Sequence, residues 1–126
     1  MKKARILIVD DESGMLEVCR DALRDLPNTV LELESNSRYA AERLKREQFD
    51  LLITDLRMPG MSGAELVRLA RKCDGTLPVL VVTAYALNEF DPAAATGGIT
   101  RFIAKPFHPD ALVAAVGRLL TASRCR

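Results

Sequence analysis

The stretch that most constrains the fold is Arg5-Ile6-Leu7-Ile8-Val9-Asp10-Asp11, an apolar run that stops abruptly at two acids. Two further runs, Asp50–Asp55 and Pro78–Thr83, are also nearly continuous in isoleucine, leucine and valine. Parallel strands that are covered on both faces have such continuous apolar runs, because neither face meets water. The three runs therefore predict the centre of a parallel sheet.

Two other segments have the length of strands but a mixed pattern. Thr29–Glu34 places Glu32 and Glu34 between apolar residues, and Ile99–Ala104 is similarly mixed. A strand with one face open to water alternates in this way. We therefore expect these segments to form the two edges of the sheet.

Stretches with helical periodicity lie between the expected strands, and Pro27 ends the first of them. A capping-box pattern begins another at Ser62. The predicted helices span Ser13–Leu26, about 37–47, 62 to about 75, and a last helix from Pro109. The segment Ala86–Thr96 has Asp91-Pro92 in its middle. It is either a short helix capped by Asp91 or a loop, and we favour the short helix.

Strands and helices thus alternate along the whole chain. This order predicts an α/β fold with an open, doubly wound parallel sheet, right-handed crossovers and helices on both faces. The 126 residues suffice for a single domain, 1–126, with a core over about 5–120. In such sheets a site forms beyond the carboxyl ends of the strands.

Composition excludes several other classes of protein. The chain is 48% hydrophobic and 28% charged with a net charge of +1, which argues against disorder and against binding to nucleic acid or a membrane surface. The run 6–9 is too short for a signal peptide, and no segment is long enough to span a membrane. Cys19, Cys73 and Cys125 form no metal-binding or disulfide pattern. We expect a soluble, cytoplasmic protein.

Polar residues stand at the ends of the expected strands: Asp10 and Asp11, then Asp55, Thr83 and Lys105. Three carboxylates at one edge would repel one another unless a cation joined them, and oxygen atoms are the ligands that Mg²⁺ prefers. With Lys105 and Thr83 they would form a clamp for a phosphoryl group, with Asp55 as the nucleophile.

Taken singly, each of these residues also has an ordinary structural explanation. Asp10 or Asp11 could cap the first helix, Asp55 could begin a loop, Thr83 could be a strand residue and Lys105 a surface charge. Their joint occurrence at strand ends favours a functional site.

Four motifs together resemble the receiver domains of bacterial two-component response regulators, from Arg5 to about Leu120. The motifs are Asp10-Asp11, Thr54-Asp55-Leu56-Arg57-Met58-Pro59-Gly60-Met61-Ser62-Gly63, Thr83-Ala84 and Lys105-Pro106-Phe107. The resemblance implies a flavodoxin-like (βα)5 three-layer sandwich whose parallel strands lie in the order 2-1-3-4-5.

By this resemblance, Asp55 is a phosphoacceptor that receives its phosphoryl group from a sensor histidine kinase or a histidine phosphotransfer protein. Asp11 and Asp55 would bind Mg²⁺ directly with the backbone carbonyl of Arg57, and Asp10 would help through water. Mn²⁺ could substitute for Mg²⁺.

The resemblance also implies that Thr83 and Lys105 hold the phosphoryl oxygens, while the small Ala84 leaves room for the phosphodonor. Phe102 matches an aromatic position whose rotamer follows Thr83, although an aromatic residue here also suits plain packing. The bond to Pro106 would be cis. Phosphorylation would bias the face made by 86–96, the fifth strand and the last helix, which would bind an effector domain or a second copy.

Two features depart from the commonest pattern of the family. Asp91-Pro92 leaves the output partner open. Arg57 and Tyr85 occupy positions that line the route of the attacking water, and this bulky pair leads to the hypothesis of slow autodephosphorylation.

Other functions fit the residues less well. A degenerate receiver used only for docking would keep the fold, but every expected chemical group is present. A haloacid-dehalogenase-like phosphatase would carry an acid where this chain has Arg57, and a flavin cofactor would be repelled by Asp10 and Asp11. We therefore predict a signalling switch that assists its own phosphorylation and dephosphorylation, not an enzyme with a separate substrate. Its kinase and output, and whether it stands alone or belongs to a longer chain, stay open.

Overall fold

The computed structural model of the protein describes residues 3–84 and 98–124, with side chains as far as residue 121. Strands and helices alternate in these ranges, as the sequence predicted. In chain order they are β1 (Ala4–Val9), α1 (Ser13–Leu23), β2 (Thr29–Glu34), α2 (Ser37–Arg46), β3 (Leu51–Thr54), α3 (Gly63–Cys73), β4 (Val79–Thr83), β5 (Thr100–Ala104) and α4 (Pro109–Arg124). The predicted helix at 86–96 lies outside the described residues.

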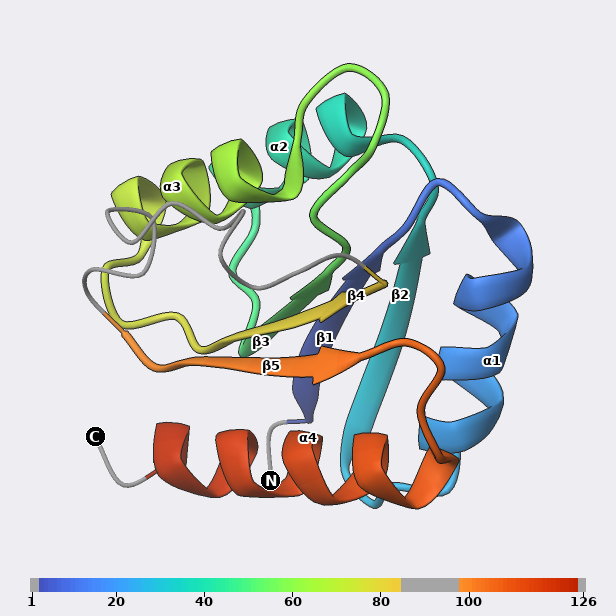
Figure 1. Ribbon diagram of the computed structural model, residues 1–126. Coiled ribbons are helices and arrows are strands. Elements are labelled where there is room, and N and C mark those ends of the chain that lie inside the picture. Colours follow the sequence, from blue (N-terminus) through green and yellow to red (C-terminus); the bar gives the residue numbers. More distant parts are fainter. Residues whose placement is uncertain (1–2, 85–97, 125–126) are drawn as a thin grey trace.

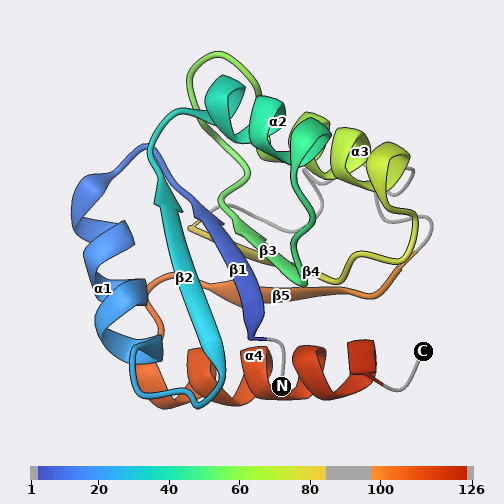
Figure 2. The same ribbon diagram turned by 180° about the vertical axis from the view of Figure 1, so that it is seen from behind.

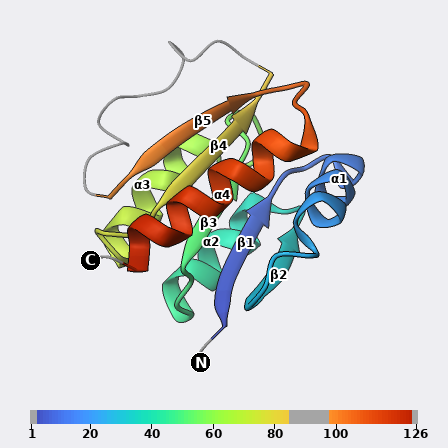
Figure 3. The same ribbon diagram turned by 90° about the horizontal axis from the view of Figure 1, so that it is seen from below.

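The strands form one parallel sheet in the order β2-β1-β3-β4-β5. The predicted order and both predicted edge strands are confirmed. Helices α2 and α3 cover one face of the sheet, and α1 and α4 cover the other (Figures 1 and 2). Figure 3 looks onto the face that α4 covers. The result is the three-layer α/β sandwich that the alternation predicted.

Each central strand feeds two hydrophobic cores, one on either face of the sheet. Leu7, Val9 and Leu52 pack toward α2 and α3, whereas Ile6 and Ile8 pack toward α1 and α4. Successive side chains of a strand point to opposite faces, so a strand covered on both sides must be apolar at every position. This is why the central strands appear as unbroken apolar runs in the sequence.

The first helix is shorter than predicted: it ends at Leu23, not at Leu26. Pro27 has no N–H to donate to the Leu23 carbonyl, four residues before it, and its ring crowds that carbonyl, so the helical hydrogen bonding stops there. The Leu26 N–H donates to the Leu23 carbonyl in a tighter turn, and Thr29 Oγ1 donates to the Leu26 carbonyl at 2.9 Å. Leu26 still packs against the core below α1.

The predicted starts of two helices are confirmed. Ser62 caps α3 by accepting a hydrogen bond from the Glu65 N–H, and Pro109 is the first residue of α4. Across the described part of the chain, none of the helices combines the length and apolar character needed to cross a bilayer.

Candidate functional site

The register of the parallel strands brings the polar strand ends to one edge of the sheet. Val9, the last residue of β1, pairs with Thr54, the last residue of β3. Asp10 and Asp55, which come directly after these two residues, therefore lie side by side. The Asp55 N–H continues the ladder by donating to the Val9 carbonyl at 3.2 Å. On the other side, the Lys105 N–H donates to the Thr83 carbonyl at 2.8 Å. Backbone pairing alone therefore fixes the position of the site.

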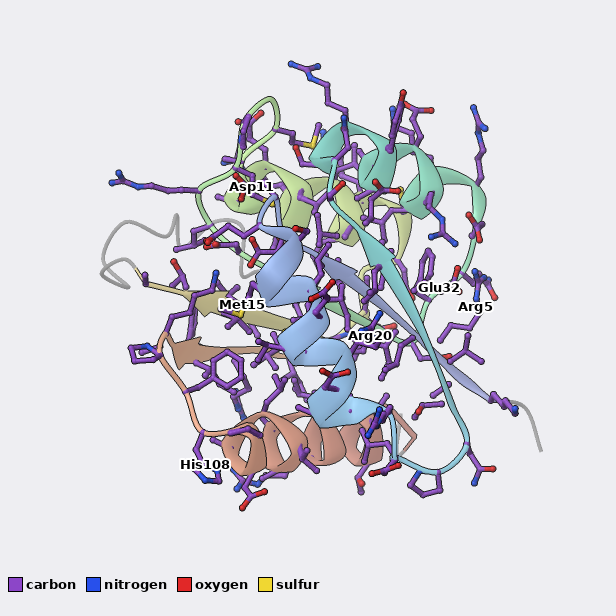
Figure 4. The ribbon with its side chains drawn as sticks, turned by 90° about the vertical axis from the view of Figure 1, so that its right-hand side faces the viewer. Arg5, Asp11, Met15, Arg20, Glu32 and His108 are labelled. Carbon is purple, nitrogen blue, oxygen red and sulfur yellow. The ribbon has the colours of Figure 1, made fainter. Side chains whose placement is uncertain are left out.

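Asp10, Asp11 and Asp55 form an acidic cluster in which one carboxylate oxygen from each lies within 4.8 Å of the others. Asp10 and Asp55 are 4% and 5% exposed, whereas Asp11 is exposed at the start of α1 (Figure 4). Carboxylates this close, two of them buried, favour a cation between them because their charges repel in a poorly solvated place. The predicted convergence of the three acids is therefore present.

Lys105 is the cation that the described residues place against this cluster. Its Nζ donates to Asp10 Oδ2 at 2.8 Å and to Asp55 Oδ2 at 2.9 Å, and its side chain is only 9% exposed. Burial by itself lowers the pKa of Lys105, but the hydrogen bonds and charges of the two acids outweigh it and raise that pKa. Lys105 therefore stays protonated.

Asp10 is held less favourably as an anion. Burial raises the pKa of Asp10, and the hydrogen bonds from Lys105 and from the Glu12 N–H oppose this rise only in part. The nearby Asp55 charge adds to the rise. A further cation bound at the cluster would therefore stabilise the ionised form of Asp10.

The backbone around Asp55 fixes the direction of its carboxylate. The Leu56 N–H donates to Asp55 Oδ1 at 2.6 Å, while Lys105 takes Oδ2. The start of α3 approaches so closely that a Cβ on Gly63 would lie 1.9 Å from the Asp55 carbonyl oxygen. In the sequence, Gly63 is only the last residue of a motif. Only the packing of α3 against the Asp55 carbonyl shows why this position needs glycine.

The remaining predicted residues lie at the same edge or outside the described part. Thr83 is fully buried at the end of β4, opposite Ala104 of β5, and Ala84 is exposed. Phe102 in β5 packs partly buried against the core below α2 and α3. The Lys105–Pro106 peptide bond is cis, as the resemblance implied. Tyr85 lies outside the described residues.

The donor set of the cluster suits a hard divalent cation. The three acids, two of them buried, offer only carboxylate oxygens. Mg²⁺ prefers oxygen ligands and keeps several waters, which an exposed position such as Asp11 allows. The residues present therefore fit the metal that the resemblance implied.

The chain thus combines a doubly wound parallel sheet with an acidic cluster and a lysine at the carboxyl edge of that sheet. The family model of the response regulator receiver domain matches residues 6–117. The chain therefore belongs to the response regulator receiver domains of two-component systems, which act as signalling switches.

Individual relatives agree with this assignment. Chemotaxis protein CheY-3 of Vibrio cholerae serotype O1 is 39% identical over 108 residues, which cover 84% of this chain and 83% of that protein. A CheY-like receiver domain protein from Methanospirillum hungatei JF-1 has a crystal structure with a TM-score of 0.86 and 27% identity, over 98% of both chains.

A third similar protein has a metal in its structure. The receiver domain of sensor histidine kinase PA1611 from Pseudomonas aeruginosa PAO1 matches with a TM-score of 0.81 and 25% identity, over 94% of this chain and 98% of that one. Its crystal structure contains a magnesium ion coordinated in the active site cleft.

Proposed function

We propose that Asp55 is the phosphoacceptor of a two-component phosphorelay. An Asp55 carboxylate oxygen attacks the phosphorus of a phosphohistidine on a sensor histidine kinase or a histidine phosphotransfer protein. The phosphorus–nitrogen bond breaks, which leaves an acyl phosphate on Asp55 and returns the imidazole. The observation that carries the proposal is the convergence of the acidic cluster on Lys105, whose Nζ lies 2.9 Å from Asp55 Oδ2.

Asp11, Asp55 and the backbone carbonyl of Arg57 would hold Mg²⁺, and Asp10 would act through a water. Bound there, Mg²⁺ or the substituting Mn²⁺ would neutralise charge on the transferring phosphoryl oxygens. The magnesium ion in the similar PA1611 receiver domain supports this assignment.

Lys105 and Thr83 supply the rest of the phosphoryl clamp in this proposal. The two acidic partners of Lys105 keep its ammonium charged. Because this ammonium already contacts Asp55, it could contact a phosphoryl oxygen once the acyl phosphate forms. The Thr83 hydroxyl, at the end of the neighbouring strand, would donate to another oxygen. Ala84 is small and exposed, which leaves the entrance open to a phosphodonor.

Thr83 and Phe102 would transmit the phosphoryl state to a binding face. We propose that this face, which the resemblance predicts to include residues 86–96 with β5 and α4, binds an effector domain or a second copy of the chain. A mostly apolar cavity of about 300 Å³ between β5 and α4, lined in part by Phe102, Ile103 and Leu119, supports a docking role. We place this domain, 1–126, in the cytoplasm, where its phosphodonors act.

The phosphoryl group of this switch is proposed to be lost slowly. Arg57 is exposed and lies two residues after Asp55, where its side chain would hinder the attacking water, and Tyr85 would act with it. Decay of phospho-Asp55 in buffer with Mg²⁺ should be faster in Arg57→Asn and in Tyr85→Ala than in the unmodified chain. The hypothesis fails if neither variant loses phosphate faster.

The proposed function is tested with acetyl phosphate and Mg²⁺. Intact mass spectrometry should show one added phosphoryl group in the unmodified protein and none in Asp55→Asn, which keeps the size of the side chain but lacks the nucleophilic oxygen. Chelation of Mg²⁺ should also abolish the modification. Absence of any spectral response to Mg²⁺ with beryllofluoride would favour the alternative, a degenerate receiver that only docks.

A further inference from the structure

The loop between β3 and α3, residues 55–62, contains both Asp55 and the Arg57 carbonyl, and it is fixed at two points. At its base, the Gly63 N–H donates to the Leu56 carbonyl at 2.7 Å, which closes the loop on itself. Its tip is a turn in which Gly60 has a positive φ of 81°. The geometry of the tip therefore depends on what holds the residues around Gly60.

Ser37, the first residue of α2, holds this tip. Its hydroxyl donates to the Pro59 carbonyl at 3.1 Å and accepts from the Met61 N–H at 3.1 Å. These two groups flank Gly60, so one hydroxyl uses its donor and an acceptor site to bridge the turn. Ser37 is only 2% exposed, so water does not compete freely for either bond.

The Ser37 hydroxyl is not required to begin its own helix. Asn36 is the N-cap of α2, and its side chain accepts from the Arg38 and Tyr39 N–H groups at 2.9 and 3.2 Å. The next residue, Arg38, lies over the turn: a Cβ on Gly60 would lie 3.1 Å from Arg38 Nε. Two successive residues of α2, Ser37 and Arg38, therefore face the loop. Ser37 is the one that forms the two hydrogen bonds to the turn.

We propose that Ser37 is a positioning residue for metal binding at Asp55, acting through the 55–62 loop. Its hydroxyl restrains Pro59, two residues after Arg57, and so would limit the positions open to the Arg57 carbonyl, the proposed metal ligand, before the metal arrives. A loop that is already ordered loses less conformational entropy on binding. This inference rests on the proposed function, because it assigns Ser37 a part in the same metal site.

The test compares Ser37→Ala with the unmodified protein by NMR titration of backbone amides with Mg²⁺. We expect the dissociation constant for Mg²⁺ to rise by about threefold to tenfold, the cost of one to two lost hydrogen bonds. In the metal-free protein, the Met61 amide should exchange its hydrogen faster. Phosphorylation by acetyl phosphate should need more Mg²⁺ for half of its maximal rate but reach nearly the same rate at saturation.

Thr29→Ala is the matched control, because it removes another partly buried hydroxyl whose hydrogen bond to Leu26 lies in the loop between α1 and β2. It should leave the Mg²⁺ affinity unchanged. Ser37→Cys, of similar size and with a weakly bonding thiol, should shift the affinity in the same direction if Ser37→Ala does not fold.

Two results would overturn the inference: unchanged Mg²⁺ affinity in a folded Ser37 variant, or an equal loss in Thr29→Ala. Failure of the unmodified protein to bind Mg²⁺ is a different result, which would contradict the proposed function itself and this inference with it.

Discussion

Two clusters of charged side chains, one that includes a residue of β1 and one just beyond the end of that strand, differ in how their carboxylates are neutralised. At the carboxyl edge of the sheet, the acidic cluster of Asp10, Asp11 and Asp55 lies against Lys105, which contacts Asp10 and Asp55. The other cluster joins Arg5 and Arg43 to Glu32 and Glu47, and we call it the arginine–glutamate network. In Figure 4, Arg5 and Glu32 lie together beside β2, well apart from Asp11.

The arginine–glutamate network is balanced in charge. Arg5 lies 2.7 Å from Glu32 and 2.6 Å from Glu47, and Arg43 contacts both acids as well. Both guanidinium groups also stack over the Phe49 ring, at 4.5 and 5.4 Å from its centroid. Hydrogen bonds from Arg43 and Arg5 lower the pKa of Glu47 to about 2.

The pKa of Asp10 at the site and the pKa of Glu47 in the network move in opposite directions. In the network the pKa of Glu47 falls, whereas at the site the pKa of Asp10 rises because it is buried. In a cluster with equal numbers of positive and negative groups, the ionised acids stabilise the fold. In a cluster with an excess of buried acids, a bound cation is needed to stabilise the ionised forms. In this protein, the balance of charge distinguishes the arginine–glutamate network from the acidic cluster, although both contain buried or partly buried carboxylates.

The largest expected effect comes from removing Lys105, the ammonium that contacts Asp10 and Asp55. Lys105→Met should lower the free energy of unfolding by about 3–5 kcal/mol without divalent metal, because it removes the ammonium that contacts two buried carboxylates. Mg²⁺ should restore more stability to this variant than to the unmodified protein, since no ammonium then competes for the acids. Urea unfolding with and without Mg²⁺ measures both.

Lys45→Met is the control for this prediction, because Lys45 pairs with Glu42 at the surface, where both side chains are half exposed. It should change stability by less than about 0.5 kcal/mol. Equal stability of Lys105→Met and the unmodified protein without metal would contradict the imbalance that we assign to the site.

Glu32→Gln should break the balance of the other cluster. It removes the charge of a partly buried acid that contacts both Arg5 and Arg43, so the free energy of unfolding should fall by about 1–2 kcal/mol. Thermal unfolding measures this loss, and Glu42→Gln at the exposed surface serves as its control. The Mg²⁺ affinity should not change, and a change would show that the two clusters are coupled.

Asp10→Asn should raise the free energy of unfolding, whereas Glu32→Gln lowers it. Because the pKa of Asp10 is raised in the folded state, its ionised form costs stability above that pKa. The uncharged variant should therefore be more stable by about 0.5–1 kcal/mol at neutral pH without metal, while binding Mg²⁺ more weakly. A variant that is less stable than the unmodified protein would remove the contrast with Glu32.

The smallest expected effect is a pH dependence in the network. The pKa of Glu47 is lowered to about 2, so the stability that its charge contributes is fully present above its ordinary pKa and disappears as the pH falls toward 2. The difference in stability between the unmodified protein and Glu47→Gln should shrink between about pH 4.5 and 2. A constant difference over that range would show that the carboxylate charge of Glu47 does not contribute.

Much of the site could be predicted from the sequence because it depends on short-range pattern. The apolar run before Asp10 and that before Asp55 each predict a buried parallel strand, and the carboxyl ends of such strands meet at one edge. No long-range contact was needed for that step. The end of α1 was predicted three residues late, because Pro27 lacks the N–H that would continue the helical hydrogen bonds at the Leu23 carbonyl.

The network was not predicted, because the sequence does not show which charges meet. Arg5 and Glu47 are 42 residues apart, and their contact depends on how α2 packs beside β1 and β2. The role of Ser37 was missed for the same reason, since its hydroxyl reaches a turn 22 residues away. An isolated serine at the start of a helix gives no signal of such a contact.

The sequence by itself determined the alternation of strands and helices, the central and edge strands, and the polar residues at the strand ends, because periodicity and local turns encode these features. Only the tertiary structure decided that Lys105, 95 residues from Asp10, reaches both Asp10 and Asp55, and that Gly63 admits α3 against the Asp55 carbonyl. The physical reason is that burial, which gives charge pairs and close approaches their strength, exists only once distant segments have packed.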